Sequence, residues 1–249
     1  MQQQKAILLC LHGWGGSKES FTELREALKD ADITILTPDL PGFGEESEPP
    51  RPWNTDDYAL WAEEWLARHL QPTTCNLQPL YILGHSHGGR IALKIAHNQS
   101  LQPITHLFLC AAAGIRRPKH TKRIIGLTLA KTGKFVLSIP GFHLLAPLGK
   151  KFLYKLFRVH NYERASPIMR QTLINVTKED ILPYLAQINC PTDIFWGEDD
   201  RMTPLADGIL MHKSIKNSEF HHFSHTSHRV HRDRAEEIAK VIRARISQK

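Results

Sequence analysis

The chain has 249 residues, a formal net charge of +7 and 41% hydrophobic residues. This length and composition are typical of a globular protein with a full hydrophobic core. No apolar stretch is long enough to span a bilayer, which excludes a membrane-spanning protein. The N-terminus runs directly into an apolar segment without the pattern of a signal peptide, and the four cysteines lack metal-ligand spacing. We therefore expect a cytoplasmic protein with reduced thiols.

Short apolar runs alternate with helical patterns along most of the chain. The runs predict strands at residues 6–11, 33–36, 80–83, 107–111, 193–196 and 219–223. The intervening patterns predict helices that begin after Ser17 and at residues 55, 86, 205 and 234. Strands alternating with helices favour an α/β protein with a parallel sheet and right-handed crossovers. Ligand chemistry then belongs at the carboxyl ends of the strands.

The stretch Gly84-His85-Ser86-His87-Gly88 follows the apolar run 80–83 and precedes a helical pattern. A strand, Gly-x-Ser-x-Gly and a helix form the context of a nucleophile elbow. The turn is so tight that side chains at Gly84 and Gly88 would collide with neighbouring backbone. Ser86 is then expected in a strained conformation, with the N–H groups of the new helix facing developing negative charge.

Two further motifs accompany the elbow, His12-Gly13-Trp14-Gly15-Gly16 and Asp39-Leu40-Pro41-Gly42-Phe43-Gly44. Together the three motifs resemble the α/β-hydrolase superfamily, and the resemblance covers nearly the whole chain. It implies a mostly parallel sheet flanked by helices, with a helical cap inserted over the active site. The segment 115–187 breaks the alternation, so we expect the cap there and the core at 1–114 and 188–249.

The same resemblance implies a serine nucleophile supported by an acid and a histidine in the chain order Ser, acid, His. Residues 197–204, Gly-Glu-Asp-Asp-Arg-Met-Thr-Pro, look like the family's Gly-x-x-Asp-x-x-x-Pro. This alignment selects Asp200 as the acid, with Asp199 as the alternative. A serine hydroxyl is a poor nucleophile at neutral pH unless a base and an orienting carboxylate support it.

The histidine is harder to assign because five histidines crowd one region, His221, His222, His225, His228 and His231. The family places its histidine shortly before a helix, usually after Gly and five residues before an acidic residue. His228 with Asp233 fits this spacing, although Ser227 replaces the usual Gly, and His225 is the alternative. His221 and His222 lie in a predicted strand and are expected to be structural. Because no second ligand group has matching spacing, we expect no metal site.

A tetrahedral intermediate needs two N–H donors directed at its oxyanion. The resemblance implies the backbone N–H groups of His87 and Trp14 for this oxyanion hole. The glycines around Trp14 would let that backbone approach a substrate. We expect His12 to be a buried histidine that hydrogen-bonds loop carbonyls, and the side chains of His85 and His87 to pack beside the elbow.

The expected cap is strongly basic. It holds 14 Lys and Arg residues against three acidic ones, a net charge of +11, so the remainder of the +7 chain carries −4. Its apolar stretches 124–129 and 142–145 could line an acyl pocket, with Leu127 and Leu144 as candidate substrate-binding residues, or could simply pack within the cap. Residues 150–158 form a basic amphipathic pattern that suits packing on the core or, as the alternative, contact with an anionic membrane surface.

These features predict a cofactor-free serine hydrolase with the triad Ser86, Asp200 and His228, acting on small carboxylic esters, including lactones. Serine at the elbow argues against relatives that use aspartate there, such as haloalkane dehalogenases and epoxide hydrolases. The enzyme alternatives are a carbon–carbon bond hydrolase and a perhydrolase. The non-enzymatic alternative is a ligand receptor that retains the triad. No nucleic-acid partner is expected.

Overall fold

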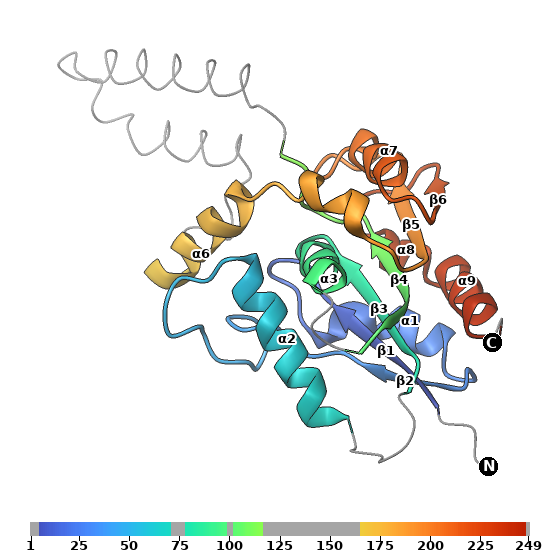
Figure 1. Cartoon of the computed structure of the whole chain (residues 1–249), viewed down its shortest axis with the longest axis horizontal. Coiled ribbons are helices and arrows are strands. Elements are labelled where there is room, and N and C mark those ends of the chain that lie inside the picture. Colours follow the sequence, from blue (N-terminus) through green and yellow to red (C-terminus); the bar gives the residue numbers. More distant parts are fainter. Residues whose placement is uncertain (1–4, 71–77, 99–101, 117–164, 248–249) are drawn as a thin grey trace, which may run out of the picture. The chain divides into compact units, whose positions relative to one another are not determined.

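The computed structural model describes residues 5–70, 78–98, 102–116 and 165–247 (Figure 1). The chain divides into two units, Met1–Arg116 with Gln171–Lys249, and Arg117–Arg170. The first unit holds a six-stranded sheet and its flanking helices.

The described residues build a sheet of six strands in the order β2-β1-β3-β4-β5-β6. Every neighbouring pair is parallel, which confirms the predicted α/β class and the parallel sheet. The strands are β1 Ala6–Leu11, β2 Ile33–Leu36, β3 Leu80–His85, β4 Ile104–Cys110, β5 Thr192–Gly197 and β6 Ser218–Phe223. β1, β3 and β5 are buried along their whole length, which explains why they are nearly continuous apolar runs.

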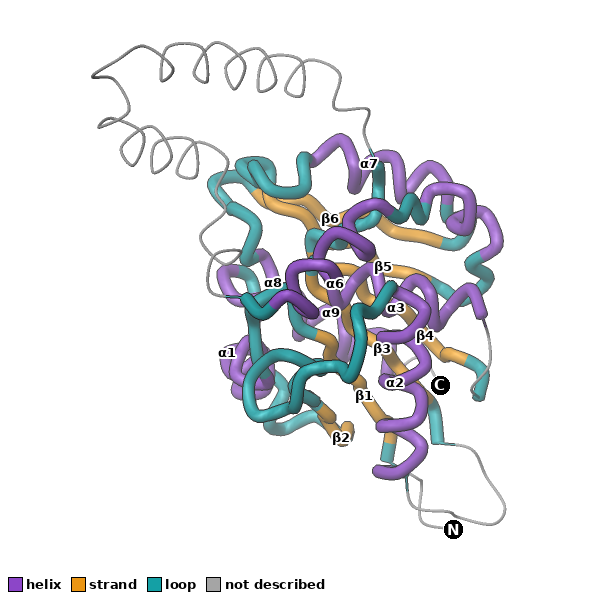
Figure 2. Tube along the Cα trace, turned by 90° about the vertical axis from the view of Figure 1, so that its left-hand side faces the viewer, coloured by secondary structure: helices purple, strands orange, loops and turns teal. Residues whose placement is uncertain are grey.

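Helices cover both faces of the sheet. The helices that the structure describes are η1 Lys18–Phe21, α1 Thr22–Ala27, α2 Thr55–His69, α3 His87–Asn98, α6 Pro167–Lys178, η3 Leu182–Gln187, α7 Leu205–Ser214, α8 Val230–Asp233 and α9 Ala235–Ser247. Figure 2 shows the strands between α1 on one side and α2 and α3 on the other. The caps are local, as at α2, where Asn54 Oδ1 accepts from Asp57 N–H and Asp57 accepts from Asn54 N–H.

The structure differs from the predicted elements at several boundaries, for example at β4, which begins at Ile104 and not at residue 107. The helix after Ser17 divides into a 3₁₀ turn and α1, because Ser20 N–H bonds back three residues to Ser17 O at 2.9 Å. The predicted last helix corresponds to α9, and the short helix α8 precedes it and ends at Arg234, whose φ is −128°. The strand expected to end at Ala111 ends at Cys110, because Ala111 has a left-handed φ of 45°.

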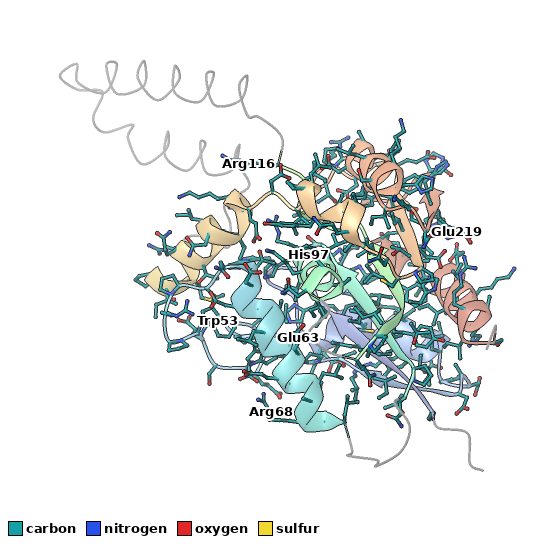
Figure 3. The ribbon with its side chains drawn as sticks, viewed as in Figure 1. Trp53, Glu63, Arg68, His97, Arg116 and Glu219 are labelled. Carbon is teal, nitrogen blue, oxygen red and sulfur yellow. The ribbon has the colours of Figure 1, made fainter. Side chains whose placement is uncertain are left out.

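From Gln171 onward, the described end of the expected cap belongs to the first unit. Ile181 and Leu185 are fully buried in its hydrophobic core. Trp53, labelled in Figure 3, lies two residues before α2. Its N–H donates to Thr172 Oγ1, and its carbonyl accepts from Asn175. Residues 117–164 lie outside the described residues, so the cap and its boundaries at 115 and 187 stay a prediction.

Among the helices that the structure describes, none combines the length and the apolar character needed to cross a bilayer.

Candidate active site

The elbow at Ser86 has the strain that the sequence predicts. Ser86 has a φ of 52°, a left-handed conformation that is costly for a residue other than glycine. Its backbone is held on both sides of the turn, because its N–H donates to Cys110 O at 3.1 Å and its carbonyl accepts from Ala113 N–H at 2.9 Å. A Cβ at Gly84 would come within 2.5 Å of Gly88 O, so only glycine fits there. The side chain of Ser86 stays partly exposed while its neighbours are buried.

The loop after β1 lies directly against the nucleophile. A Cβ at Gly13 would come within 2.9 Å of His85 Nδ1 and 3.2 Å of Ser86 Cβ. The turn that follows is closed by the hydrogen bond from Gly16 N–H to Gly13 O at 2.9 Å. Among the described residues, no hydrogen bond uses the backbone N–H of Trp14, and His87 is the first residue of α3, where helix N–H groups have no helical acceptor.

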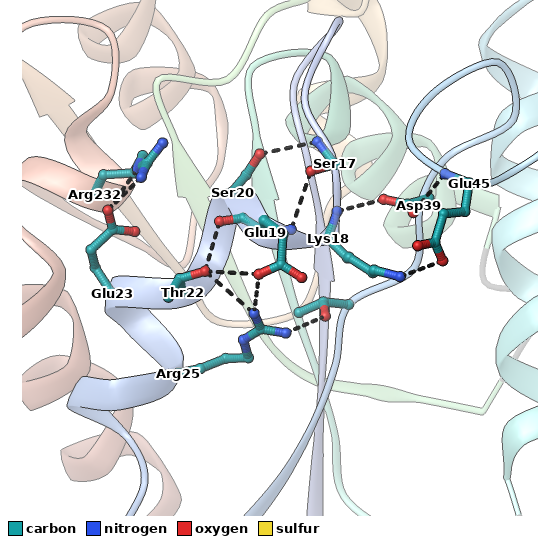
Figure 4. A network of polar contacts seen from close by, with 11 residues as sticks. Ser17, Lys18, Glu19, Ser20, Thr22, Glu23, Arg25, Asp39, Glu45 and Arg232 are labelled. Atoms are coloured by element: carbon teal, nitrogen blue, oxygen red, sulfur yellow. Dashed lines mark hydrogen bonds and ion pairs between the residues drawn. The ribbon is translucent and has the colours of Figure 1, made fainter.

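A polar network connects the end of this loop to the loop after β2 (Figure 4). Asp39 Oδ1 accepts from the backbone N–H of Lys18 at 2.6 Å, and its Oδ2 accepts from Glu45 N–H at 3.0 Å. Burial raises the pKa of Asp39, but these two backbone hydrogen bonds outweigh burial and lower its pKa overall. The charged carboxylate therefore ties the loops after β1 and β2 together, which accounts for the Asp39 motif near the glycine-rich loop.

Asp200 and His228 meet at the carboxyl ends of β5 and β6. His228 Nδ1 lies 2.7 Å from Asp200 Oδ2, and the carboxylate side chain is fully buried. Because a carboxylate only accepts, Nδ1 carries a proton, and a lone pair on Nε2 is the one with which the ring can act as a base. Burial raises the pKa of Asp200, but the hydrogen bonds from His228, Thr203 and Met202 N–H hold its pKa below the usual value.

The alternative acid, Asp199, and the alternative base, His225, are both exposed. Asp199 is exposed, and only its backbone N–H is engaged, with Thr226 O at 3.0 Å. His225 is also exposed and takes a left-handed φ of 53° in the turn after β6. The structure thus brings together Asp200 and His228, the pair that the family pattern selects.

Thr203 also contacts the proposed acid and base, which the sequence did not predict. Its hydroxyl lies 2.7 Å from Asp200 Oδ2, 3.2 Å from His228 Nδ1 and 3.2 Å from Ala111 O. It links the acid, the histidine and the loop after β4. The available signal was Asp200 itself, because an Asp side chain often accepts from backbone N–H groups two or three residues later, as it does here from Met202 and Thr203.

The other histidines near the elbow have distinct surroundings. His12 Nε2 accepts from Leu40 N–H at 2.9 Å and its Nδ1 bonds Gly13 O at 2.8 Å, so His12 is a buried loop anchor, as predicted. Burial lowers its pKa, which suits a neutral ring that both donates and accepts. The ring of His87 packs edge-on against Tyr58 and Trp14, at centroid distances of 4.9 and 5.4 Å.

A second titratable cluster lies at the opposite ends of the strands. Asp193 is fully buried and accepts from His106 at 2.7 Å, His221 at 2.6 Å and Arg245 at 2.8 Å. Ligand atoms of Asp193, Glu219 and His221 lie within 4.8 Å of one another, as a cation site would need. Arg245 also binds Glu219 at 2.6 Å, so one guanidinium already pairs with both carboxylates. The predicted structural role of His221 follows from this ion-pair network.

The two candidate substrate-binding residues, Leu127 and Leu144, lie outside the residues that the structure describes, as does the basic stretch 150–158. Their roles stay predictions.

Comparison with known proteins agrees with the fold and the motifs. Residues 6–235 match the family described as alpha/beta hydrolase fold. The chain therefore belongs to the α/β-hydrolase family, and this membership supports an enzyme of the hydrolase class.

Two lipases and an esterase are among the proteins similar to this chain. Lipase 1 of Psychrobacter immobilis is 26% identical over 222 residues, which cover 85% of this chain and 68% of the lipase. Lipase 3 of Moraxella sp. (strain TA144) is 27% identical over 205 residues, covering 78% of this chain and 62% of that lipase. An esterase from Exiguobacterium antarcticum superposes with a TM-score of 0.72 at 22% identity, covering 97% of this chain and 92% of the esterase, a likeness of fold.

Proposed function

We propose that the protein is a serine hydrolase of small carboxylic esters, with Ser86 as nucleophile, His228 as base and Asp200 as the orienting acid. The observation that carries this proposal is the 2.7 Å contact between His228 Nδ1 and buried Asp200, at the same sheet edge as the strained elbow of Ser86. Similarity to two lipases supports ester substrates.

The proposed reaction is acyl transfer to water in two steps. His228 Nε2 takes the proton from Ser86 Oγ as that oxygen attacks the ester carbonyl carbon. Asp200 holds the ring with Nδ1 protonated and stabilises the imidazolium that forms. The tetrahedral intermediate collapses, the alcohol leaves with the proton from His228, and an acyl-serine remains. His228 then deprotonates a water, whose oxygen attacks the acyl carbon. When the second tetrahedral intermediate collapses, the acid leaves and Ser86 Oγ takes the proton back from His228.

The negative oxygen of each tetrahedral intermediate needs preorganised donors. We assign this role to the backbone N–H groups of His87 and Trp14. Three features support the assignment: the position of His87 at the start of α3, the N–H of Trp14 that bonds no described residue, and the contact of Gly13 with the nucleophile turn. Each such donor typically contributes about 10²–10³ in rate.

A panel of p-nitrophenyl esters of rising chain length, with lactones alongside, tests this proposal. Wild type should turn over at least one ester, and Ser86→Ala should lose nearly all of that turnover while still folding. Ser214→Ala is the matched control, because the Ser214 hydroxyl donates to Leu210 O within α7 and contacts no residue of the proposed triad. Absence of turnover in the wild type across the panel would favour a receptor that retains the triad. Equal turnover in Ser86→Ala would refute the assigned nucleophile.

A further inference from the structure

The side chain of His85 connects the parts of the proposed active site. His85 ends β3, directly before Ser86, and is 7% exposed. Its Nε2 lies 3.0 Å from the backbone carbonyl oxygen of His228. A carbonyl oxygen can only accept, so His85 Nε2 carries a proton and donates.

Two histidine rings and the glycine-rich loop also lie against the ring of His85. The ring of His231 lies 3.8 Å away, centroid to centroid, and that of His228 lies 4.9 Å away. On a further side, a Cβ at Gly13 would meet His85 Nδ1 at 2.9 Å, so the glycine-rich loop lies against the ring. His85 therefore contacts the loop of the proposed base and the loop of the proposed oxyanion hole, and it is joined covalently to the proposed nucleophile.

The described hydrogen bonds of the loop that carries His228 lead mostly to β5 and not to β3, the strand before Ser86. The end of β5 holds the loop through Asp199 N–H to Thr226 O at 3.0 Å, and Gly197 leaves no room for a Cβ against Thr226 and Ser227. Those contacts relate the loop to the strand of the acid. Among the described residues, the hydrogen bond of His85 is the one that relates His228 to the strand that carries Ser86.

We propose that His85 is a positioning residue, which sets the distance between His228 and Ser86 by donating a hydrogen bond to the backbone carbonyl of His228. The inference rests on the proposed function, since it concerns the same reaction. Burial lowers the pKa of His85 well below its usual value and lowers the pKa of His231 to about 3. Both rings therefore stay neutral while the enzyme works, and the donor is present throughout.

The test compares His85→Leu, which removes the donor, with His85→Gln, which keeps an N–H near the position of Nε2. Loss of alignment between base and nucleophile acts on the transition state, so His85→Leu should lower kcat about 10- to 100-fold with little change in KM. His85→Gln should recover most of that loss. Turnover is expressed per active site, counted by titration with a serine-directed phosphonate, so that unfolded protein does not contribute.

His106→Leu is the matched control. His106 is also a buried histidine with one hydrogen bond, to Asp193 at the far end of the sheet. It should lower the unfolding temperature without changing kcat per titrated site. If His85→Leu behaves like His106→Leu, or if His85→Gln is no better than His85→Leu, His85 is only structural and the proposal is wrong.

A measurement on the wild type covers the case in which the variants fail to fold. The ¹⁵N–¹H correlation spectrum of the imidazole rings should show His85 as the Nε2–H tautomer between about pH 6 and pH 8. An Nδ1–H tautomer would contradict the proposal, because no donor would then face His228 O. The two levels of proposal fail differently: a wild-type protein that no phosphonate labels refutes the serine mechanism, whereas labelled protein with an unaffected His85→Leu variant refutes the role of His85 alone.

Discussion

At the scale of single residues, the choice between neighbouring candidates decides the chemistry. Asp199 and Asp200 are adjacent in the chain, yet the first is exposed and the second is buried against His228. Asp200→Asn should reduce kcat about 10⁴-fold, because the amide no longer holds the tautomer that the base needs. Asp199→Asn should change kcat little. Steady-state kinetics on one ester measures both, and the reverse ranking would show that the acid has been assigned to the wrong residue.

The histidines offer the same comparison. His228→Ala removes the proposed base and should cost several orders of magnitude in kcat, whereas exposed His225→Ala should leave kcat near that of the wild type. Circular dichroism of both variants controls for folding. A large loss of kcat in His225→Ala with a small loss in His228→Ala would identify His225, and not His228, as the base.

The sequence predicted the elbow well because its strain is local. Gly84 and Gly88 are needed by the turn itself, and Ser86 takes the expected left-handed conformation. The contacts of Thr203 with Ala111 and of His85 with His228 were not predictable in the same way, because they join segments far apart in the chain. Side-chain pairing of this kind depends on strand register, which a single sequence specifies only indirectly.

At the scale of elements, the buried carboxylate of Asp193 joins β4, β5, β6 and α9. Breaking such a buried ion pair from one side typically costs about 3–5 kcal/mol, so Asp193→Asn should lower the free energy of unfolding by that amount at pH 7. Urea unfolding measures the change. Glu219→Gln is the control, because the Glu219 side chain is 63% exposed and should contribute less than about 1 kcal/mol.

The stabilisation from Asp193 should also depend on pH. Burial raises its pKa, but hydrogen bonds from His106, His221 and Arg245 outweigh burial and hold the pKa well below the usual range. A lowered folded-state pKa gives stability that is present above the unfolded-state value of about 4 and is lost as the pH falls toward the folded-state value. The gap between wild type and Asp193→Asn should therefore be constant from pH 5 to pH 7 and narrow below about pH 4. A gap that widens with acid would contradict this linkage.

At the scale of the whole molecule, charge is distributed unevenly along the chain. Residues 115–187 carry +11 and the remainder −4. If this asymmetry steers anionic substrates, kcat/KM for a carboxylate-bearing ester should fall with added salt, while a neutral ester of similar size changes little. Replacing Lys150, Lys151 and Lys155 by Gln should reproduce that loss at low salt. An equal salt response of the two esters would mean that these charges only keep the segment hydrated.

The apolar stretches of the same segment give a separate prediction. Leu127→Trp or Leu144→Trp should shift the preferred p-nitrophenyl ester toward shorter acyl chains, because a larger side chain fills volume in an acyl pocket. Comparison of kcat/KM across the chain-length panel measures the shift. An unchanged profile in both variants would remove these leucines from the substrate site.

The central claim is that Ser86 is the nucleophile, and covalent labelling tests it most directly. After incubation with a serine-directed phosphonate, intact-mass and peptide mass spectrometry should show one adduct per chain, located on Ser86, at a rate that falls sharply in His228→Ala. Ser86→Ala should take up no label, and Ser214→Ala should be labelled like the wild type. An adduct on another serine, or equal labelling of Ser86→Ala, would contradict the account.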